Sequence, residues 1–317
     1  MLRYIVRRIL ISIIVVWLVS VVVFCMVHAL PGDPVQIILG DEATAETITM
    51  YREKLHLNEP LVKQYFMWLQ DLLRGDLGNS LITNKPIGQL LLEKVPRTVS
   101  IGLPALLIAS VLGIFFGIVS VVKRGSWIDQ AITFFTTVGI GTPHFWVGIL
   151  AIYIFSIHWK VLPVGGYASL SESPRDWAIH LVMPVICLAL GLTAQITRYT
   201  RSNMLEVINQ DYIRTARSCG ISERTILYKY ALRNALIPVV AEIGLLVRVI
   251  IGGSVTVEQV ANIAGIGQMM VSSVNNRDYT MIQDGVLVIS LFVVICNLMV
   301  DIAYGLIDPR IRRQRGI

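Results

Sequence analysis

Six long apolar runs are the feature that most restricts how this 317-residue chain can fold. The runs cover residues 9–30, 99–122, 131–157, 178–197, 236–257 and 285–307. A helix that crosses a bilayer needs about 20 apolar residues, and each run is long enough to supply them. With 55% hydrophobic and only 15% charged residues, the composition is that of an integral membrane protein. We therefore expect an all-α membrane protein with six transmembrane helices.

Three of these runs carry further local signals. The first is longer than the apolar core of about 7–15 residues in a secretory signal peptide, so it is predicted to stay as a transmembrane helix. The third contains Gly139, Gly141 and Pro143, which predict a kink. Pro238 is expected in the first turn of the fifth helix, where proline is tolerated.

The distribution of Lys and Arg predicts the orientation. Basic residues are concentrated in the two termini, in loop 123–129 and in the stretch 198–233. Those on the other side lie mostly in the long loop 31–97, and long loops carry little weight in this rule. Both termini are therefore predicted to be cytoplasmic, and loop 31–97 to be extracytoplasmic.

Loop 31–97 is predicted to form a small extracytoplasmic cap. Apolar residues recur there at helical spacing, namely Leu61, Tyr65, Trp68, Leu69 and Leu72. The turn sequences PGDP at 31–34 and GDLGNS at 75–80 lie on either side of this helix. Two roles remain open, a docking surface for an extracytoplasmic partner or a lid that packs on the helices. The chain divides into an N-terminal segment with the first span (1–30), the cap loop (31–98) and a transmembrane core (99–317) that includes cytoplasmic loop 198–235.

The cytoplasmic loop is polar, basic and predicted to be helical. Its apolar residues Leu205, Ile208, Tyr212 and Ala216 are spaced as on one face of a helix. Gly220 suits a helix C-terminus. Ser222 is expected to cap a second helix, with Glu223 in its first turn. Spacing alone leaves two readings, an amphipathic helix on the membrane surface or a helix that a partner's groove accepts.

Several motifs along the chain resemble those of the permease subunits of ABC importers, in particular the first permease of dipeptide, oligopeptide and nickel importers. The motifs, in order, are RYIVRRIL near the start, LPGDP at 30–34, GDLGNS at 75–80, PRT at 96–98, VKRGS at 122–126, DYIRTARSCG with ALRNALIPVV, and IDPRIRR at 307–313. Where the broad permease pattern has Glu-Ala-Ala, this chain has Arg214, Thr215 and Ala216. That difference is typical of the peptide and nickel branch.

The resemblance implies a cytoplasmic coupling helix that docks on a separate ATPase subunit. The residues implied in that contact are Tyr212, Ile213, Arg214, Thr215, Ala216, Arg217 and Gly220. The implied partners are a second homologous permease, two ATP-binding subunits, an extracytoplasmic solute-binding protein, membrane lipid, and a di- or oligopeptide substrate. The implied location is a bacterial or archaeal plasma membrane. Nickel, or a nickel chelate, is the alternative cargo.

Enzyme activity, cofactors and nucleic-acid binding are not expected. The chain has no GxxxxGK[ST] phosphate-binding loop, so ATP hydrolysis is assigned to partner subunits. No basic patch is interleaved with stacking aromatic residues. No metal-ligand spacing joins the four cysteines, which are Cys25, Cys187, Cys219 and Cys296. A secondary transporter driven by an ion gradient is the alternative of another class, but the inverted repeats and broken helices typical of it are not recognised. An uncoupled channel or scaffold is a third possibility.

Charged residues inside the fifth run are candidates for the translocation path. Glu242 and Arg248 lie six residues apart, which places them about 120° apart around a helix. Charges within a membrane usually face a cavity or a partner. Glu242 is expected to pair with another helix, and Arg248 to face the path or the second permease. Asn297 and Asp301 are expected to form interhelical hydrogen bonds.

Three of the five histidines are expected near the outer ends of helices, namely His28, His158 and His180. Imidazole is a suitable ligand for nickel. Histidines at a membrane interface also occur without a metal, and this interpretation is favoured, with peptide cargo.

Overall fold

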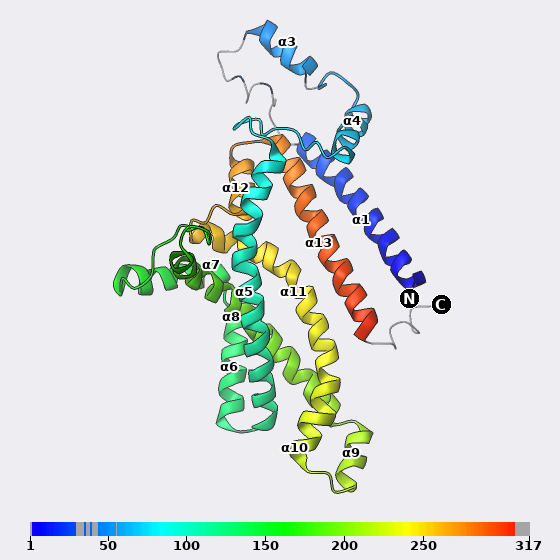
Figure 1. The fold of residues 1–317 in the computed structure, drawn as a ribbon, viewed down its shortest axis with the longest axis vertical. Coiled ribbons are helices and arrows are strands. Elements are labelled where there is room, and N and C mark those ends of the chain that lie inside the picture. Colours follow the sequence, from blue (N-terminus) through cyan, green and yellow to red (C-terminus); the bar gives the residue numbers. More distant parts are fainter. Residues whose placement is uncertain (1, 30–34, 36–38, 40–43, 55, 308–317) are drawn as a thin grey trace.

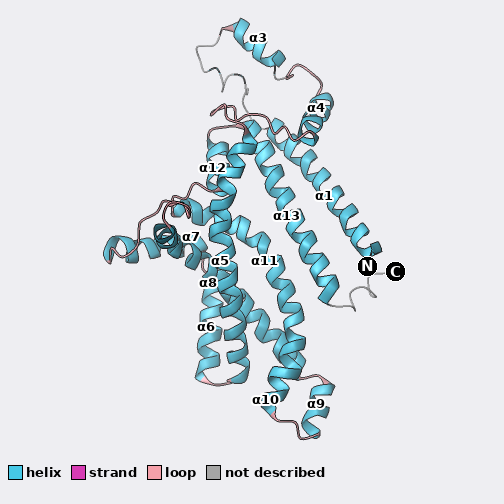
Figure 2. Ribbon diagram, viewed as in Figure 1, coloured by secondary structure: helices cyan, strands magenta, loops and turns pink. Residues whose placement is uncertain are grey.

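The computed structural model describes residues 2–29, 35, 39, 44–54 and 56–307. The predicted turn at 31–34 and the C-terminal segment 308–313 lie outside these residues. Figure 2 shows helices joined by loops throughout the described part. The elements are α1 (Leu2–His28), α3 (Ala45–Lys54), α4 (Leu61–Leu73), α5 (Ile87–Val122), α6 (Trp127–Gly141), α7 (His144–Ala151), the π-helix η1 (Ile152–His158), α8 (Pro174–Ile208), α9 (Asp211–Ser218), α10 (Glu223–Thr225), the π-helix η2 (Ile226–Ala231), α11 (Leu232–Val260), α12 (Ile266–Asn275) and α13 (Tyr279–Ile307).

The helices agree with the six predicted membrane spans. Five single helices are long and apolar enough to cross a bilayer, and a bent pair makes up to six. The bent pair is α6 with α7 and η1, which meet at an angle of 101°. The break falls at residues 142–143, so the kink predicted from Pro143 is confirmed and is sharper than a simple bend. In Figure 1, α6 runs beside α5, whereas α7 turns away from that direction.

Some helix boundaries differ from the predicted ones. α5 begins at Ile87 and contains Pro96 and Pro104 as interior residues. Pro238 was expected in a first turn but lies inside α11. The reason is that η2 precedes α11 without a break, so the helical segment starts well before the proline.

The main core lies where α5, α8 and α11 meet. Its most buried side chains include Ile101 of α5 and Leu188, Leu192 and Ile196 of α8, all at most 1% exposed. Burying such a side chain contributes about 1.5–3 kcal/mol in a water-soluble protein. Within lipid, close packing and hydrogen bonds have to replace much of that driving force.

Small residues on α5 bring it close to α8. A Cβ atom at Gly113 would lie 2.6 Å from the Cβ of Ile196, and one at Gly117 would lie 2.5 Å from the Cβ of Thr200. Glycines four residues apart on one helix are typical of closely packed membrane helices. α5 and α8 therefore touch almost backbone to backbone.

The outermost pair of helices, α1 and α13, lie side by side (Figure 1). Arg8 of α1 donates a hydrogen bond of 2.5 Å to Asp301 of α13, which confirms the expected interhelical role of Asp301. At the opposite end of this pair, the predicted cap helix forms as α4. The indole nitrogen of Trp68 donates to Asp284 of α13 at 2.6 Å, and the ring of Tyr65 packs on Phe24 of α1. α4 of the cap thus packs on α1 and α13.

Candidate coupling and translocation sites

The segment between α8 and α11, residues 209–231, lies at the end of the molecule opposite the cap (Figure 1). It is called the α8–α11 loop below. α9 has Asp211 in its first turn and Arg217 in its last, which suits the helix dipole. Gly220 follows with φ of +77°. Its N–H donates to Arg217 O at 2.9 Å, and Ile221 N donates to Ala216 O at 3.2 Å. These two bonds form a Schellman C-cap, so the predicted glycine turn is present.

The buried face of α9 packs against the helical turn that follows it. Ile213 is 0% exposed and Ala216 is 8% exposed, and both pack against Ile226, which is also 0% exposed. The hydrophobic residue after the glycine, Ile221, packs against the same cluster. Side chains at positions 213 and 216 therefore support the loop from inside.

The apolar stripe predicted along one helix is wrong. α8 ends at Ile208 and α9 begins at Asp211, so the four residues of the stripe belong to two helices. Leu205 and Ile208 pack in a separate cluster with Met204. Tyr212 is 43% exposed. The helix breaks at 209–210 without a glycine or proline, and for this reason spacing alone did not reveal the break.

The outward face of α9 is polar and basic. Its exposed members are Asp211, Tyr212, Arg214, Thr215, Arg217 and Ser218. The Arg217 side chain donates to both carboxylate oxygens of Glu223, at 2.6 and 3.4 Å. This hydrogen bonding raises the pKa of the Arg217 guanidinium. Of the seven residues predicted to meet a partner, five are exposed, whereas Ile213 and Ala216 are buried.

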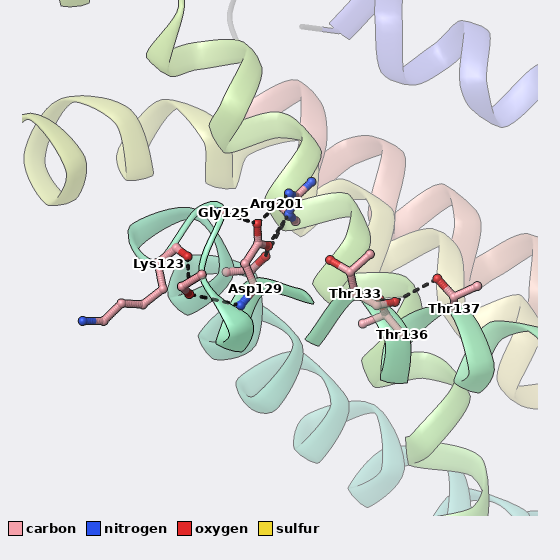
Figure 3. Close-up of polar contacts among 9 residues, drawn as sticks. Lys123, Gly125, Asp129, Thr133, Thr136, Thr137 and Arg201 are labelled. Atoms are coloured by element: carbon pink, nitrogen blue, oxygen red, sulfur yellow. Dashed lines mark hydrogen bonds and ion pairs between the residues drawn. The ribbon is translucent and has the colours of Figure 1, made fainter. Parts of the chain in front are cut away.

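Two long-range side-chain contacts lie at this end of the molecule, one from the loop to α11 and one between α8 and α6. The amide of Asn234, in the first turn of α11, donates to the hydroxyl oxygen of Tyr212 at 2.9 Å. Deeper in the structure, Arg201 of α8 donates two hydrogen bonds to Asp129 of α6, at 3.0 and 3.1 Å (Figure 3). Neither contact was predicted, because each joins residues far apart in the chain that no motif relates.

The Asp129 carboxylate is a buried anion with several donors. It is 5% exposed and also accepts from the Ser120 hydroxyl and from Gly125 N, the latter at 3.1 Å. Two parallel bonds from one guanidinium to one carboxylate form a strong and directional pair. The pair fixes the turn between α5 and α6 against the final turns of α8.

Glu242 and Arg248 lie on α11 as predicted, on different sides of the helix. Glu242 is partly buried and Arg248 is exposed. Within the described residues neither side chain forms a hydrogen bond or ion pair. The expected pairing of Glu242 with another helix is therefore not found there. A charged side chain without a hydrogen bond or ion pair needs water or another protein chain beside it when it lies within a membrane.

Arg248 belongs to a polar, exposed face of α11. Gly252, Thr256 and Gln259 are exposed as well. At 100° per residue the four positions fall within about 80° of one another. This set is called the α11 polar face. Its three uncharged members were not predicted, although the four residues are spaced four, four and three apart, as on one face of a helix.

The three histidines considered for nickel do not come together. His28 contacts Phe24 O and the Gln64 side chain, and His180 contacts Asp176 O. Among the residues that the structure describes, no cluster of three His, Cys, Asp or Glu side chains has the geometry to hold a metal ion.

Two family models match the chain. Residues 109–313 match the binding-protein-dependent transport system inner membrane component, and residues 1–102 match the N-terminal part of such membrane components. The first match alone covers more than half of the chain and includes α9, α11 and the Asp129–Arg201 pair.

Curated relatives align over nearly the whole length. The oligopeptide transport system permease protein AppB of Bacillus subtilis is 38% identical, over 98% of this chain and 99% of its own. The dipeptide transport system permease protein DppB of Alkalihalophilus pseudofirmus is also 38% identical, over 98% and 100%. The glutathione transport system permease protein GsiC of Escherichia coli O6:H1 is 37% identical, over 98% and 99%.

Solved structures share the fold at low identity. A chain of the inward-facing MetNI methionine ABC transporter matches with a TM-score of 0.54 and 19% identity, over 71% of this chain and 99% of that one. A chain of an amino acid ABC transporter matches with a TM-score of 0.54 and 17% identity, over 70% and 94%. With the fold, the membrane helices and the family match in agreement, the chain belongs to the family of inner membrane components of binding-protein-dependent transport systems and is an integral membrane permease.

Proposed function

We propose that this chain is one permease subunit of an ATP-driven importer of di- or oligopeptides. It forms half of the translocation path with a second, homologous permease. ATP is hydrolysed by two separate subunits, and an extracytoplasmic binding protein delivers the peptide. The relatives reported above are named for oligopeptides, dipeptides and glutathione, which supports peptide as the cargo. No observation favours nickel.

The observation that carries the proposal is the construction of α9. It is held from inside by Ile213 and Ala216, presents a polar and basic face, and is bonded to α11 through Tyr212. A helix with this construction offers a surface to a partner and a connection to the membrane helices at once. We assign α9 as the coupling helix that docks on an ATPase subunit.

The orientation follows from the same assignment. An ATPase acts from the cytoplasm, so α9, the turn at 123–125 and both termini are placed on the cytoplasmic side. α4 and α12 then lie outside, where the binding protein arrives. The concentration of Lys and Arg in the termini and in 198–233 supports this direction.

The α11 polar face is proposed to line the path. Arg248 is exposed in mid-helix, and the face continues outward through uncharged polar residues. Two permeases that place such faces toward each other enclose a polar passage. The polar groups then face this passage and avoid the unfavourable contact with lipid.

Purification of the tagged chain from its native membranes in mild detergent tests the assembly. We expect a second permease and ATPase subunits to co-purify, and ATP-dependent peptide uptake when the complex is placed in liposomes with its binding protein. A chain that purifies alone and still transports without ATP would instead establish a secondary transporter.

The docking role of α9 is tested on the same complex with Arg214→Glu. The Arg214 side chain is 72% exposed and its partner Asp211 is 97% exposed, so the change reverses a surface charge without disturbing the core. Loss of ATPase subunits from the purified complex is the expected result. The matched control is Arg224→Glu, at an exposed position on α10, which should retain them.

A further inference from the structure

A cavity of about 630 Å³ lies at the cap end of the molecule. Its walls come from the start of α5, from α12, from the loop at 80–83 and from Gln259 near the end of α11. It lies apart from α9 and is not part of the docking surface proposed above.

The cavity wall carries the hydrogen-bonding groups that a peptide main chain requires. Gln259, Gln268 and Asn276 supply amide side chains, and Lys94 supplies an ammonium group. An amide side chain both donates and accepts, so it can pair with the N–H and C=O groups of any peptide. Met269 and Met281 are also part of the wall. Methionine side chains adapt to apolar groups of different shapes.

Some of these groups have bonding capacity to spare. Within the described part of the chain, the Gln259 side chain makes no hydrogen bond. The ammonium of Lys94 contacts the Glu93 carboxylate at 3.0 Å, which leaves two of its three donors. The Lys94 side chain is 19% exposed, so its charge is partly shielded from solvent. Its attraction to a carboxylate is therefore stronger than in bulk water.

The walls are fixed in place before any ligand arrives. Glu258 of α11 is fully buried. It accepts from the Thr98 hydroxyl of α5 at 2.6 Å and from Gln268 N of α12 at 3.0 Å. Buried Asp278 accepts from the Ser80 hydroxyl at 2.5 Å. These bonds hold three helices and the loop together, and a preformed site loses less entropy on binding.

The cavity leads directly to the α11 polar face. Gln259 belongs to both, and Thr256, Gly252 and Arg248 continue from it along the helix. A peptide that leaves the cavity along this side therefore passes the Thr256 hydroxyl and the small Gly252 before it meets Arg248.

We infer that this cavity is an entry site that holds an incoming peptide by its main chain, with the peptide's C-terminal carboxylate on Lys94. The inference rests on the proposed function, because it assumes peptide cargo and an outward-facing cap end. The lysine confers a preference for peptides with a free C-terminus. The amide side chains confer tolerance of sequence, because main-chain groups are the same in every peptide.

Uptake by the complete importer in liposomes, with one binding protein throughout, tests the inference. The wild-type importer and each variant are given the same peptide as a free acid and as a C-terminal amide. For each importer, the ratio of acid uptake to amide uptake is measured. Any preference of the binding protein enters both importers equally. For Lys94→Gln we expect the acid-to-amide ratio to fall about tenfold, because a charge-assisted hydrogen bond is lost. Lys94→Arg should restore the ratio, and Lys85→Gln, exposed outside the cavity, should leave it unchanged.

A second variant tests the main-chain contacts. Gln259 is exposed, so Gln259→Ala does not disturb folding, and it should raise the half-saturating concentration of acid and amide alike by about threefold to tenfold. An unchanged acid-to-amide ratio in Lys94→Gln, including an equal loss of both peptides with the complex intact, overturns the inference, and so does an unchanged half-saturating concentration in Gln259→Ala. In those cases wild-type uptake still stands and the proposed function is unaffected. If the wild type imports neither peptide with ATP, the proposed function itself fails.

Discussion

The hydroxyl oxygen of Tyr212 on α9 accepts a hydrogen bond of 2.9 Å from the side-chain amide of Asn234 on α11. The helix proposed to meet the ATPase is therefore bonded to the helix proposed to line the path. Between them in sequence lie Gly220, α10 and η2, so the bond spans the open side of the α8–α11 loop and closes it.

Tyr212→Phe removes this bond and keeps the aromatic ring. A hydrogen bond of this kind contributes about 0.5–1.5 kcal/mol, so the complex should assemble normally. We expect fewer peptides imported per ATP hydrolysed, because movement of α9 passes less completely to α11. Uptake and ATPase rate measured on the same liposomes give this ratio. Tyr228→Phe is the control, since Tyr228 is 51% exposed, and an equal ratio in both variants would count against the link.

Ala216→Glu is expected to damage the α8–α11 loop itself. Ala216 is 8% exposed and packs with Ile213 and Ile226, so a carboxylate there loses its hydration without gaining a partner. Protease cleavage within residues 209–231 should become much faster than in the wild type. Thr215→Glu, on the exposed side of the same helix, should be cleaved at the wild-type rate. Equal resistance of the two variants would show that α9 does not need its inner face.

Asp129→Ala is expected to destabilise the permease by on the order of 3 kcal/mol. Removing one member of a buried ion pair leaves the other without its partner, although the Arg201 side chain is 31% exposed and recovers part of this in water. Thermal unfolding in detergent should show a clearly lower midpoint. Asp211→Ala breaks an exposed pair and should shift the midpoint little.

Gly117→Ala is expected to separate α5 from α8. The added Cβ would lie 2.5 Å from the Cβ of Thr200 and 3.1 Å from the carbonyl oxygen of Thr197, and overpacking of this kind costs about 1–3 kcal/mol. Less folded protein in the membrane fraction is the expected readout. Gly141→Ala places its Cβ in open space and serves as the control. Equal yields from the two variants would contradict the close approach.

The membrane helices were predictable because their signal is local. A span needs only length and apolar composition, and both are read directly from the runs. The bend at residues 142–143 was also local, since Pro143 removes a backbone donor. Its angle of 101° depends on how α7 packs against α8 and α11, which no local pattern records.

The candidate sites were predictable only in part, for the same reason. The DYIRTARSCG motif and the turn at Gly220 predicted the position of helix α9 correctly. Which of its faces is buried depends on Ile226, ten residues beyond Ala216 and in a π-helix that has no sequence signature. On α11, within the apolar run 236–257, only the two charged residues, Glu242 and Arg248, stand out. The uncharged Thr256 and Gln259 complete the polar face, and their exposure becomes clear only once α12 is in place.

The short joint between α8 and α9 has a mechanical consequence. Only residues 209–210 separate the two helices, so there is almost no slack between them. α8 has 35 residues, which makes it a rod about 50 Å long. A push of about 3 Å on α9 therefore tilts this rod by only about 3–4°. Since α5 is packed against α8 through Gly113 and Gly117, a tilt of α8 would carry α5 with it.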